Sequence, residues 1–550
     1  MSTLLLWSWL AVVAAPPSSV SIPAGPSAEP ADTVLVCPPV FLNEMKPWLA
    51  HRTQQGHVVH IVRGDQSATA IRDEIRAASR AAQNGDGLRA ILLIGDADPA
   101  AERDPQVRAR CTPTHQAIAK VNVKWGSEPT IAADNWYADL DDDDLPDAAI
   151  GRLPVDSPAE LRSIVRRILA YEKSTDFGLW RRKVNFVAGV GGFGLITDAV
   201  LETATKKFLT DGIPTAYSTT MTYGSWRSPY CPDPRRFQQA TVARFNEGCL
   251  FFVYIGHGHP LQLDRVQLPN AAYPILSIRD VGLLQSQQQP PIAVMLACYT
   301  GAFDLTRDCL AEEMLRQEGG PIALLCGSRI TMPYAMAVMS HGMLEEAFKQ
   351  RRETLGEVLL HAKRRMMKDE PEDGHRQLVD ALAAALSPSP DLLVEERREH
   401  LHLFNLLGDP LLRLRHPAPI ELEIATDVEA GQLVEVTAVC PIKGEATLEL
   451  VCRRDRTKSP PPTRGPFEQA SKNFEEFDAT YQEANDHRWY VEKLSFDEPG
   501  AAKTEIRVPL DAHGPCHLKL HVRGADGDAL GAANVFVRRL RNLPDNAAAP

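Results

Sequence analysis

Two residues capable of nucleophilic and acid–base chemistry stand where apolar segments end. His257 follows the run "FFVYI" in "FFVYIGHGHP", and Cys298 follows "IAVMLA" in "IAVMLACYTGAFD". Continuous apolar runs of this length are typical of strands buried on both faces of a parallel sheet. Ligands of such sheets bind at the carboxyl ends of the strands. If the two strands are neighbours, the imidazole of His257 and the thiol of Cys298 meet at that edge.

A thiol beside an imidazole is an arrangement used for nucleophilic catalysis. An ordinary cysteine has a pKa of about 8.5, and a neighbouring imidazolium lowers that pKa and yields a reactive thiolate. Two simpler interpretations stay open at this point. Cys298 is a small buried apolar residue, or His257 and His259 begin a zinc site. The residues from Pro260 to Asp264 add no third histidine to such a site.

The glycine-rich segment "GVGGFG", Gly189 to Gly194, follows a predicted strand and fits the G-x-G-x-x-G pattern of dinucleotide-binding turns. The next predicted strand, "IPTAYSTT", ends in Ser and Thr where a ribose-binding acid is required. Besides dinucleotide binding, the segment is interpreted as a tight turn between strand and helix or as a loop that borders a substrate site.

The composition is that of a folded, acidic, globular protein. The 550 residues are 44% hydrophobic and 24% charged, and the formal net charge is -12. A chain of this charge is not expected to bind nucleic acid or an anionic membrane surface. The ten cysteines include no C-x-x-C pair, which argues against a zinc ribbon and a disulfide scaffold.

The first residues have the pattern of an export signal. Residues 4–15, "LLLWSWLAVVAA", form an apolar run too short to span a bilayer, followed by a lead rich in Pro, Ser and Ala. We expect a signal peptide and lead over residues 1–32 and a secreted, periplasmic or cell-surface protein. The alternative is an apolar N-terminus without a targeting role. No later run is long and apolar enough to predict a transmembrane segment.

Strand and helix patterns alternate through the next part of the chain, which predicts an α/β fold with a parallel sheet. We divide it into a first α/β subdomain over residues 33–180 and a second over 181–416, which carries His257 and Cys298. Within the first, Ser157 and Glu160 have the spacing of a capping box ahead of an amphipathic helix.

The pattern changes after residue 416. Short runs that alternate apolar and polar residues predict an all-β, antiparallel sandwich over residues 417–541. The stretch 454–485, rich in Pro, Lys and Glu, is expected to be a long loop, and residues 542–550 a flexible tail.

An acidic loop precedes the capped helix. Its aspartates have the oxygen donors that calcium prefers, and Asp139, Asp141 and Asp143 are the candidate ligands. The full set is Asp139, Asp141, Asp142, Asp143, Asp144 and Asp147. The twelve-residue EF-hand pattern is absent, so the alternative is a solvated acidic loop. Any metal here would be structural.

Several segments together resemble the gingipain family of cysteine peptidases. They are "VYIGHG", "LACYTGAF" and "CLAEEML", with "DNWYADLDDDDLPDAAIGRLP", "TLGEVLLHAK" and "FNLLGDPLLRL" in the expected order. The resemblance covers roughly residues 33–415 and implies a caspase-like catalytic fold. The sandwich that follows is similar to the immunoglobulin-like domain that often trails this peptidase.

The resemblance also implies roles for individual residues. His257 matches the catalytic histidine and Cys298 the nucleophile, and the N–H groups of Gly258 and Cys298 match the oxyanion hole. In the family an acid from the loop that here reads "GVGGFG" orients the histidine, but this loop contains no acid. Asp198, shortly after the loop, is a candidate for orienting His257 or for selecting a basic side chain before the cleaved bond; alternatively it only charges the first turn of a helix.

These features predict a secreted cysteine endopeptidase that acts on a protein or peptide substrate and requires no cofactor for its chemistry. One alternative keeps the site and passes the acyl group to an amine, as a transpeptidase or processing enzyme of secreted proteins. The other is an inactive peptidase fold used as a surface-binding protein.

Overall fold

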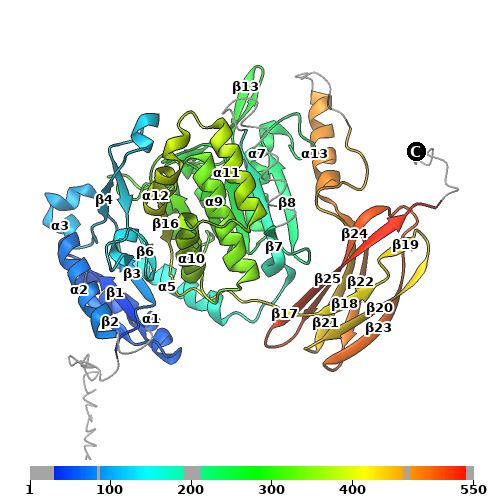
Figure 1. The fold of residues 1–550 in the computed structure, drawn as a ribbon, viewed down its shortest axis with the longest axis horizontal. Helices are drawn as coiled ribbons and strands as arrows, with labels where there is room; N and C mark the ends of the chain where they lie inside the picture. Colours follow the sequence, from blue (N-terminus) through cyan, green and yellow to red (C-terminus); the bar gives the residue numbers. More distant parts are fainter. Residues whose placement is uncertain (1–29, 83–86, 191–211, 463, 465–470, 541–550) are drawn as a thin grey trace, which may run out of the picture.

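The computed structural model describes residues 30–82, 87–190, 212–462, 464 and 471–540. It has an α/β part and, after residue 416, a β-rich part beside it (Figure 1). The predicted signal peptide and the predicted flexible tail lie outside the described residues. No helix in the described ranges has the length and apolar character needed to cross a lipid bilayer.

The α/β part is organised around one ten-stranded sheet in the order β2-β1-β3-β6-β16-β15-β14-β9-β7-β8. Every neighbouring pair is parallel except β15 and β16. The strands are β1 Thr33–Cys37, β2 Val59–Arg63, β3 Ala90–Ile94, β6 Ala149–Leu153, β7 Lys183–Ala188, β8 Ser218–Tyr223, β9 Phe251–Ile255, β14 Ile292–Leu296, β15 Ala323–Gly327 and β16 Phe404–Leu407.

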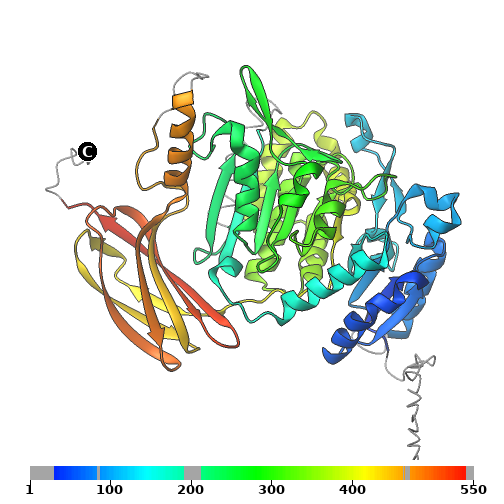
Figure 2. The ribbon, with the colours of Figure 1, turned by 180° about the vertical axis from the view of Figure 1, so that it is seen from behind.

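The sheet runs without interruption through both predicted subdomains, because Arg152 of β6 pairs with Leu407 of β16. β1, β3, β14 and β15 are buried at every residue, as their continuous apolar sequences require. Helices cover both faces of the second half. α9 to α12 lie on the face seen in Figure 1, and α5, α7 and α8 on the face seen in Figure 2.

The α-helices of the α/β part within the described ranges are α1 Leu42–Gln54, α2 Ala68–Ala82, α3 Pro105–Arg108, α4 Asn135–Ala138, α5 Pro158–Lys173, α7 Phe237–Asn246, α8 Leu310–Arg316, α9 Pro333–Leu344, α10 Leu355–Met367, α11 Gly374–Leu386 and α12 Leu393–Leu403. The capping box predicted for α5 is confirmed, because the Glu160 N–H donates to Ser157 Oγ and the Glu160 carboxylate accepts from the Ser157 N–H. Three short antiparallel pairs lie outside the main sheet: β4 His115–Ile118 with β5 Thr130–Ala133, β10 Gly258–His259 with β11 Gln262–Leu263, and β12 Arg265–Leu268 with β13 Ala271–Pro274.

Two sheets share an apolar core in the C-terminal part. One contains β17 Ala418–Pro419, β25 Asp528–Arg538, β24 Gly514–Arg523, β21 Gly444–Cys452 and β22 Arg488–Phe496 in that order, with β19 Asp427–Glu429 also on β25. The other contains β18 Glu421–Ile424, β20 Leu433–Cys440 and β23 Gly500–Arg507. β17 and β19 run parallel to β25, and the other pairs are antiparallel. The immunoglobulin-like assignment stays a prediction.

The expectation of a long loop at 454–485 is wrong for its second half, which forms α13 Ser471–Asn485. Phe474, Phe477 and Tyr481 are buried along this helix, and packing of this apolar side outweighs the loop-like composition. α13 lies beside the edge strand β8. The Asn485 side chain accepts a hydrogen bond from the Met221 N–H at 2.8 Å and donates to the Met221 carbonyl at 3.0 Å.

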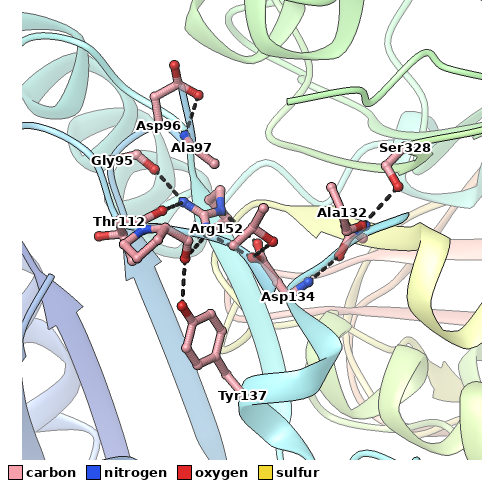
Figure 3. Close-up of polar contacts among 12 residues, drawn as sticks. Gly95, Asp96, Ala97, Thr112, Ala132, Asp134, Tyr137, Arg152 and Ser328 are labelled. Carbon is pink, nitrogen blue, oxygen red and sulfur yellow. Dashed lines mark hydrogen bonds and ion pairs between the residues drawn. The ribbon is translucent and has the colours of Figure 1, made fainter. Parts of the chain in front are cut away.

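A buried ion pair lies at the junction of the two halves of the main sheet. Arg152 is inaccessible to solvent, and its Nε and Nη2 donate to the two carboxylate oxygens of Asp134, each at 2.7 Å (Figure 3). Its Nη1 donates to the carbonyls of Gly95 at 2.8 Å and Thr112 at 2.7 Å. The guanidinium carbon lies 5.1 Å from the ring centre of Phe303, in the segment that follows Cys298. The pair therefore connects the first half of the sheet, at the strand that pairs with β16, to that segment.

Replacing Asp134 by Asn is expected to lower the melting temperature of the α/β part. Loss of one partner leaves the Arg152 charge buried without its counter-ion, which typically costs about 3–5 kcal/mol. Differential scanning calorimetry measures the change. The matched control is Glu44→Gln, which breaks the exposed pair between Glu44 and Arg162 and is expected to leave the melting temperature unchanged. Equal melting curves for Asp134→Asn and the native chain would contradict the structural importance of the buried pair.

Candidate active site

His257 and Cys298 leave the sheet side by side. β9 and β14 are neighbouring parallel strands, with Ile255 opposite Leu296 at their last paired position. His257 and Cys298 each follow two residues later. The Gly256 N–H donates to the Leu296 carbonyl at 3.3 Å, so the pairing continues just past the strand ends. The expectation that the two strands are neighbours is therefore confirmed.

The backbone of His257 is held by two donors. The hydroxyl of Tyr254 donates to the His257 carbonyl at 2.8 Å, and the N–H of Asp264 donates to the same oxygen at 3.1 Å. Tyr254 is completely buried, and its position is fixed because it lies within β9. The short hairpin of β10 and β11 returns the chain so that Asp264 lies beside the histidine.

Gly258 packs directly against the backbone of the cysteine. A Cβ atom at residue 258 would lie 2.5 Å from the Cys298 carbonyl oxygen and 2.9 Å from Thr300 Cγ2. Any side chain would therefore push the two strand ends apart. Among the described residues, no acceptor of a hydrogen bond from the Cys298 N–H is present.

The thiol of Cys298 is partly accessible, and Thr331 contacts it. The Thr331 N–H points at Cys298 Sγ at 3.3 Å, and Thr331 Oγ1 lies 3.6 Å from the sulfur. All ten cysteines lie in the described ranges, and the other nine are buried. Burial raises the pKa of those thiols, for example of Cys37 to about 12 and of Cys111 to about 11. Cys298 is thus the accessible thiol of this chain.

The turn that presents Cys298 contains a left-handed residue. Tyr299 has a φ of 57°, which for a non-glycine residue costs roughly 1–2 kcal/mol. Its N–H donates to the Arg329 carbonyl at 3.1 Å, and its hydroxyl donates to Glu128 at 2.9 Å. These contacts hold Tyr299 in a conformation that turns the chain sharply after the cysteine.

Asp264 is an acid near His257 that sequence reasoning did not select. Burial raises the pKa of its carboxyl group above the usual value. The charges of His257 and His259 oppose that rise without cancelling it. A Cβ added to Gly189, the first residue after β7, would lie 3.2 Å from Asp264 Oδ2. In the sequence Asp264 is only an acid seven residues after His257. The fold shows that the hairpin of β10 and β11 brings this acid back to the histidine.

The structure leaves two sequence predictions untested. Asp198 and residues 191–194 of the glycine-rich segment lie outside the described residues. The described start of that segment, at Gly189, borders Tyr254 and Asp264. The interpretations of the glycine-rich segment stay predictions.

The acidic loop brings three of its carboxylates together. Asp139 and Asp141 lie together with Asp147, with one oxygen from each within 4.8 Å of the others. Asp143 is not in this group, and its carboxylate accepts a hydrogen bond from the Leu145 N–H at 2.7 Å. Arg72 pairs with Asp139 at 3.3 Å, so part of the negative charge is already compensated. Calcium binding by the group stays a prediction.

The mixed α/β architecture, with a large sheet dominated by parallel strands, is the caspase-like fold of the gingipain peptidases. Residues 27–415 match the model of peptidase family C25, and the chain belongs to this family. The resemblance seen in the sequence is therefore confirmed.

Individual relatives are distant. Lys-gingipain of Porphyromonas gingivalis is 22% identical over 309 residues, which cover 54% of this chain and 16% of that protein. A crystal structure of gingipain R, an Arg-specific cysteine proteinase, is 16% identical with a TM-score of 0.50 and covers 94% of this chain and 100% of its own. A complex of the pro- and mature domains of RgpB from Porphyromonas gingivalis is 15% identical with a TM-score of 0.50. It covers 92% of this chain and 100% of its own. These structures establish the fold.

If the acidic group binds calcium, excess calcium raises the melting temperature of the native chain relative to a chelator-treated sample. Asp141→Asn is expected to abolish that rise, because it replaces one charged carboxylate ligand of the group of Asp139, Asp141 and Asp147 by a neutral amide. Asp143→Asn is the matched control and is expected to retain the rise. If the melting temperature of the native chain does not change with calcium, the acidic segment is a solvated loop that binds no calcium.

Proposed function

We propose that this chain is a cysteine endopeptidase in which Cys298 is the nucleophile and His257 the general base. The observation that carries the proposal is the position of the accessible thiol. It follows a strand that pairs in register with the strand leading to His257, in a chain of peptidase family C25. The proposed substrates are proteins or peptides, and the proposed location is secreted, periplasmic or cell-surface.

In the proposed mechanism His257 takes the proton from Cys298 Sγ, and the thiolate attacks the carbonyl carbon of the scissile peptide bond. The oxyanion accepts hydrogen bonds from the N–H groups of Gly258 and Cys298. His257 then gives its proton to the departing amine, and the acyl group stays on the sulfur as a thioester. Water, deprotonated by His257, attacks the thioester and releases the carboxylic acid and the free thiol.

The residues around His257 and Cys298 support this assignment, because they fix the positions of the His257 backbone and the Cys298 sulfur. The Tyr254 hydroxyl and the Asp264 N–H hold the His257 carbonyl. Thr331 donates its N–H toward Cys298 Sγ, an arrangement that stabilises a thiolate. In this proposal both Asp264 and Thr331 are positioning residues that do not contact the scissile bond.

A peptide-library digest analysed by mass spectrometry tests the proposal directly. Cys298→Ala is expected to abolish cleavage, and His257→Ala to lower kcat by about 10²–10⁴ because the general base is lost. His259→Ala is the matched control, since its exposed side chain lies next to the site without an assigned role, and it is expected to retain cleavage. Equal losses in the two histidine variants would contradict the assignment of His257.

The same proteins separate the alternatives. Iodoacetamide is expected to label Cys298 of the native chain and to label His257→Ala more slowly, since the imidazole no longer promotes the thiolate. Equal labelling of both would favour an inactive binding protein. Products that carry an added amine at the new carboxyl end, formed in place of hydrolysis products, would favour the transpeptidase.

Gly258→Ala tests the oxyanion hole. Its methyl group would lie 2.5 Å from the Cys298 carbonyl oxygen, so the N–H groups of residues 258 and 298 must separate. We expect kcat/KM to fall by about 10²–10³, the effect typical of losing one oxyanion donor, with Cys298 still alkylated. Gly282→Ala is the control, because no atom lies within 4 Å of the added Cβ. Full activity of Gly258→Ala would exclude this role for Gly258.

A further inference from the structure

A polar cavity lies at the C-terminal end of α9, away from the strand ends that carry the candidate active site. Its volume is about 830 Å³, and its walls come from the end of α9, the turn after it, and the segment that leads into α11. α9 and α11 pack against each other (Figure 1). The residues that face the cavity include two histidines and four acids: His341, His375, Glu345, Glu370, Glu372 and Asp373.

Three of these side chains converge. His341, on α9, is 4% exposed, and its Nε2 lies 2.6 Å from Asp373 Oδ2. Asp373 caps α11, and its other oxygen accepts from the N–H groups of His375 and Arg376 at 3.0 and 3.1 Å. The rings of His341 and His375 meet edge to face, with centres 5.5 Å apart. One ligand atom from each of His341, Asp373 and His375 lies within 4.8 Å of the other two.

The donor set identifies the kind of ion. Two imidazole nitrogens and one carboxylate oxygen with an open fourth position suit zinc and similar divalent transition metals, whereas calcium and magnesium prefer oxygen donors alone. Around a tetrahedral zinc with bonds of about 2.0–2.1 Å, neighbouring ligand atoms are about 3.3 Å apart. His341 and Asp373 already meet at a shorter separation, and His375 is the more exposed of the two histidines.

The charges around the cavity favour a cation. Its four acids face two basic residues, Lys349 and Arg365. Lys349 pairs with Glu345, and Arg365 pairs with Glu370 at 2.9 Å while it lies 3.8 Å from Asp373. Since the two basic side chains compensate two of the four acids, a net negative charge remains at the mouth of the three-residue cluster.

The helix that supplies His341 has an irregular end. Immediately after α9 the chain forms one π-helical turn, Glu345–Lys349, and Glu345 from this turn faces the cavity. Single π-helical turns occur often at functional sites, because the wider turn redirects side chains. At its other end, α9 begins two residues after Thr331, whose N–H points at Cys298 Sγ.

We propose that His341, Asp373 and His375 bind a divalent transition-metal ion, zinc being the best fit, and that the ion fastens the C-terminal end of α9 to the start of α11. The fourth position faces the cavity and takes water or one of its glutamates. Each histidine binds through a neutral nitrogen, so binding displaces the hydrogen bond between His341 and Asp373. The ion braces the helix whose N-terminal end borders the candidate nucleophile.

Cobalt titration of the full chain tests the site. The parent protein carries Cys298→Ala, which removes the accessible thiol as a competing metal ligand. After chelator treatment and dialysis, cobalt(II) is expected to bind at one equivalent with visible d–d bands, and zinc is expected to displace it. His375→Ala is expected to weaken cobalt binding by more than about 100-fold, because it removes a ligand rather than an outer contact.

The controls make the result decisive. His60→Ala removes an exposed histidine on β2 and is expected to bind cobalt like the parent. Circular dichroism verifies that His375→Ala, whose side chain is only partly buried, is folded. The proposal is overturned if the parent binds no cobalt, if folded His375→Ala binds it with the parent's affinity, or if a thiolate-to-cobalt charge-transfer band places the ion on a cysteine.

Discussion

The parallel, in-register pairing of β9 and β14 is the constraint on which the candidate active site depends. Each residue of β14 from Ile292 to Leu296 has its partner in β9, and all five are buried. A slip of one residue would move Cys298 by about 3.3 Å along the strand and turn its side chain to the other face of the sheet. The relative position of thiol and imidazole therefore follows from the packing of the whole sheet, and the turns at Gly258 and Tyr299 only refine it.

A second layer of contacts keeps the strand ends in place. Arg152 and Asp134 both come from the segment "DNWYADLDDDDLPDAAIGRLP", and their ion pair lies where the two halves of the sheet join. Phe303, against the same guanidinium, belongs to the segment that follows Cys298. This long acidic segment thus contributes to the site indirectly, because its Arg152 packs against the segment that follows the nucleophile.

Short sequence patterns were sufficient to predict the features that depend on neighbouring residues alone. The apolar runs gave the strands, and the Ser157 and Glu160 spacing gave the start of α5. Features that depend on distant segments were not predictable. Asp264 reaches His257 only through a hairpin, α13 is stabilised by burying Phe477 and Tyr481, and His341 and His375 meet only because α9 packs on α11. The continuity of the sheet across β6 and β16 is likewise a long-range pairing with no sequence signature.

The amide of Asn485 has a consequence for solubility. A strand at the border of a sheet offers unpaired backbone groups to any other strand, and such borders are where proteins aggregate. At Met221 in the middle of β8, Asn485 occupies both the N–H and the carbonyl, much as a further strand would. The C-terminal part of the chain therefore blocks intermolecular strand addition at Met221, and a fragment ending near residue 416 would leave this position of the border open.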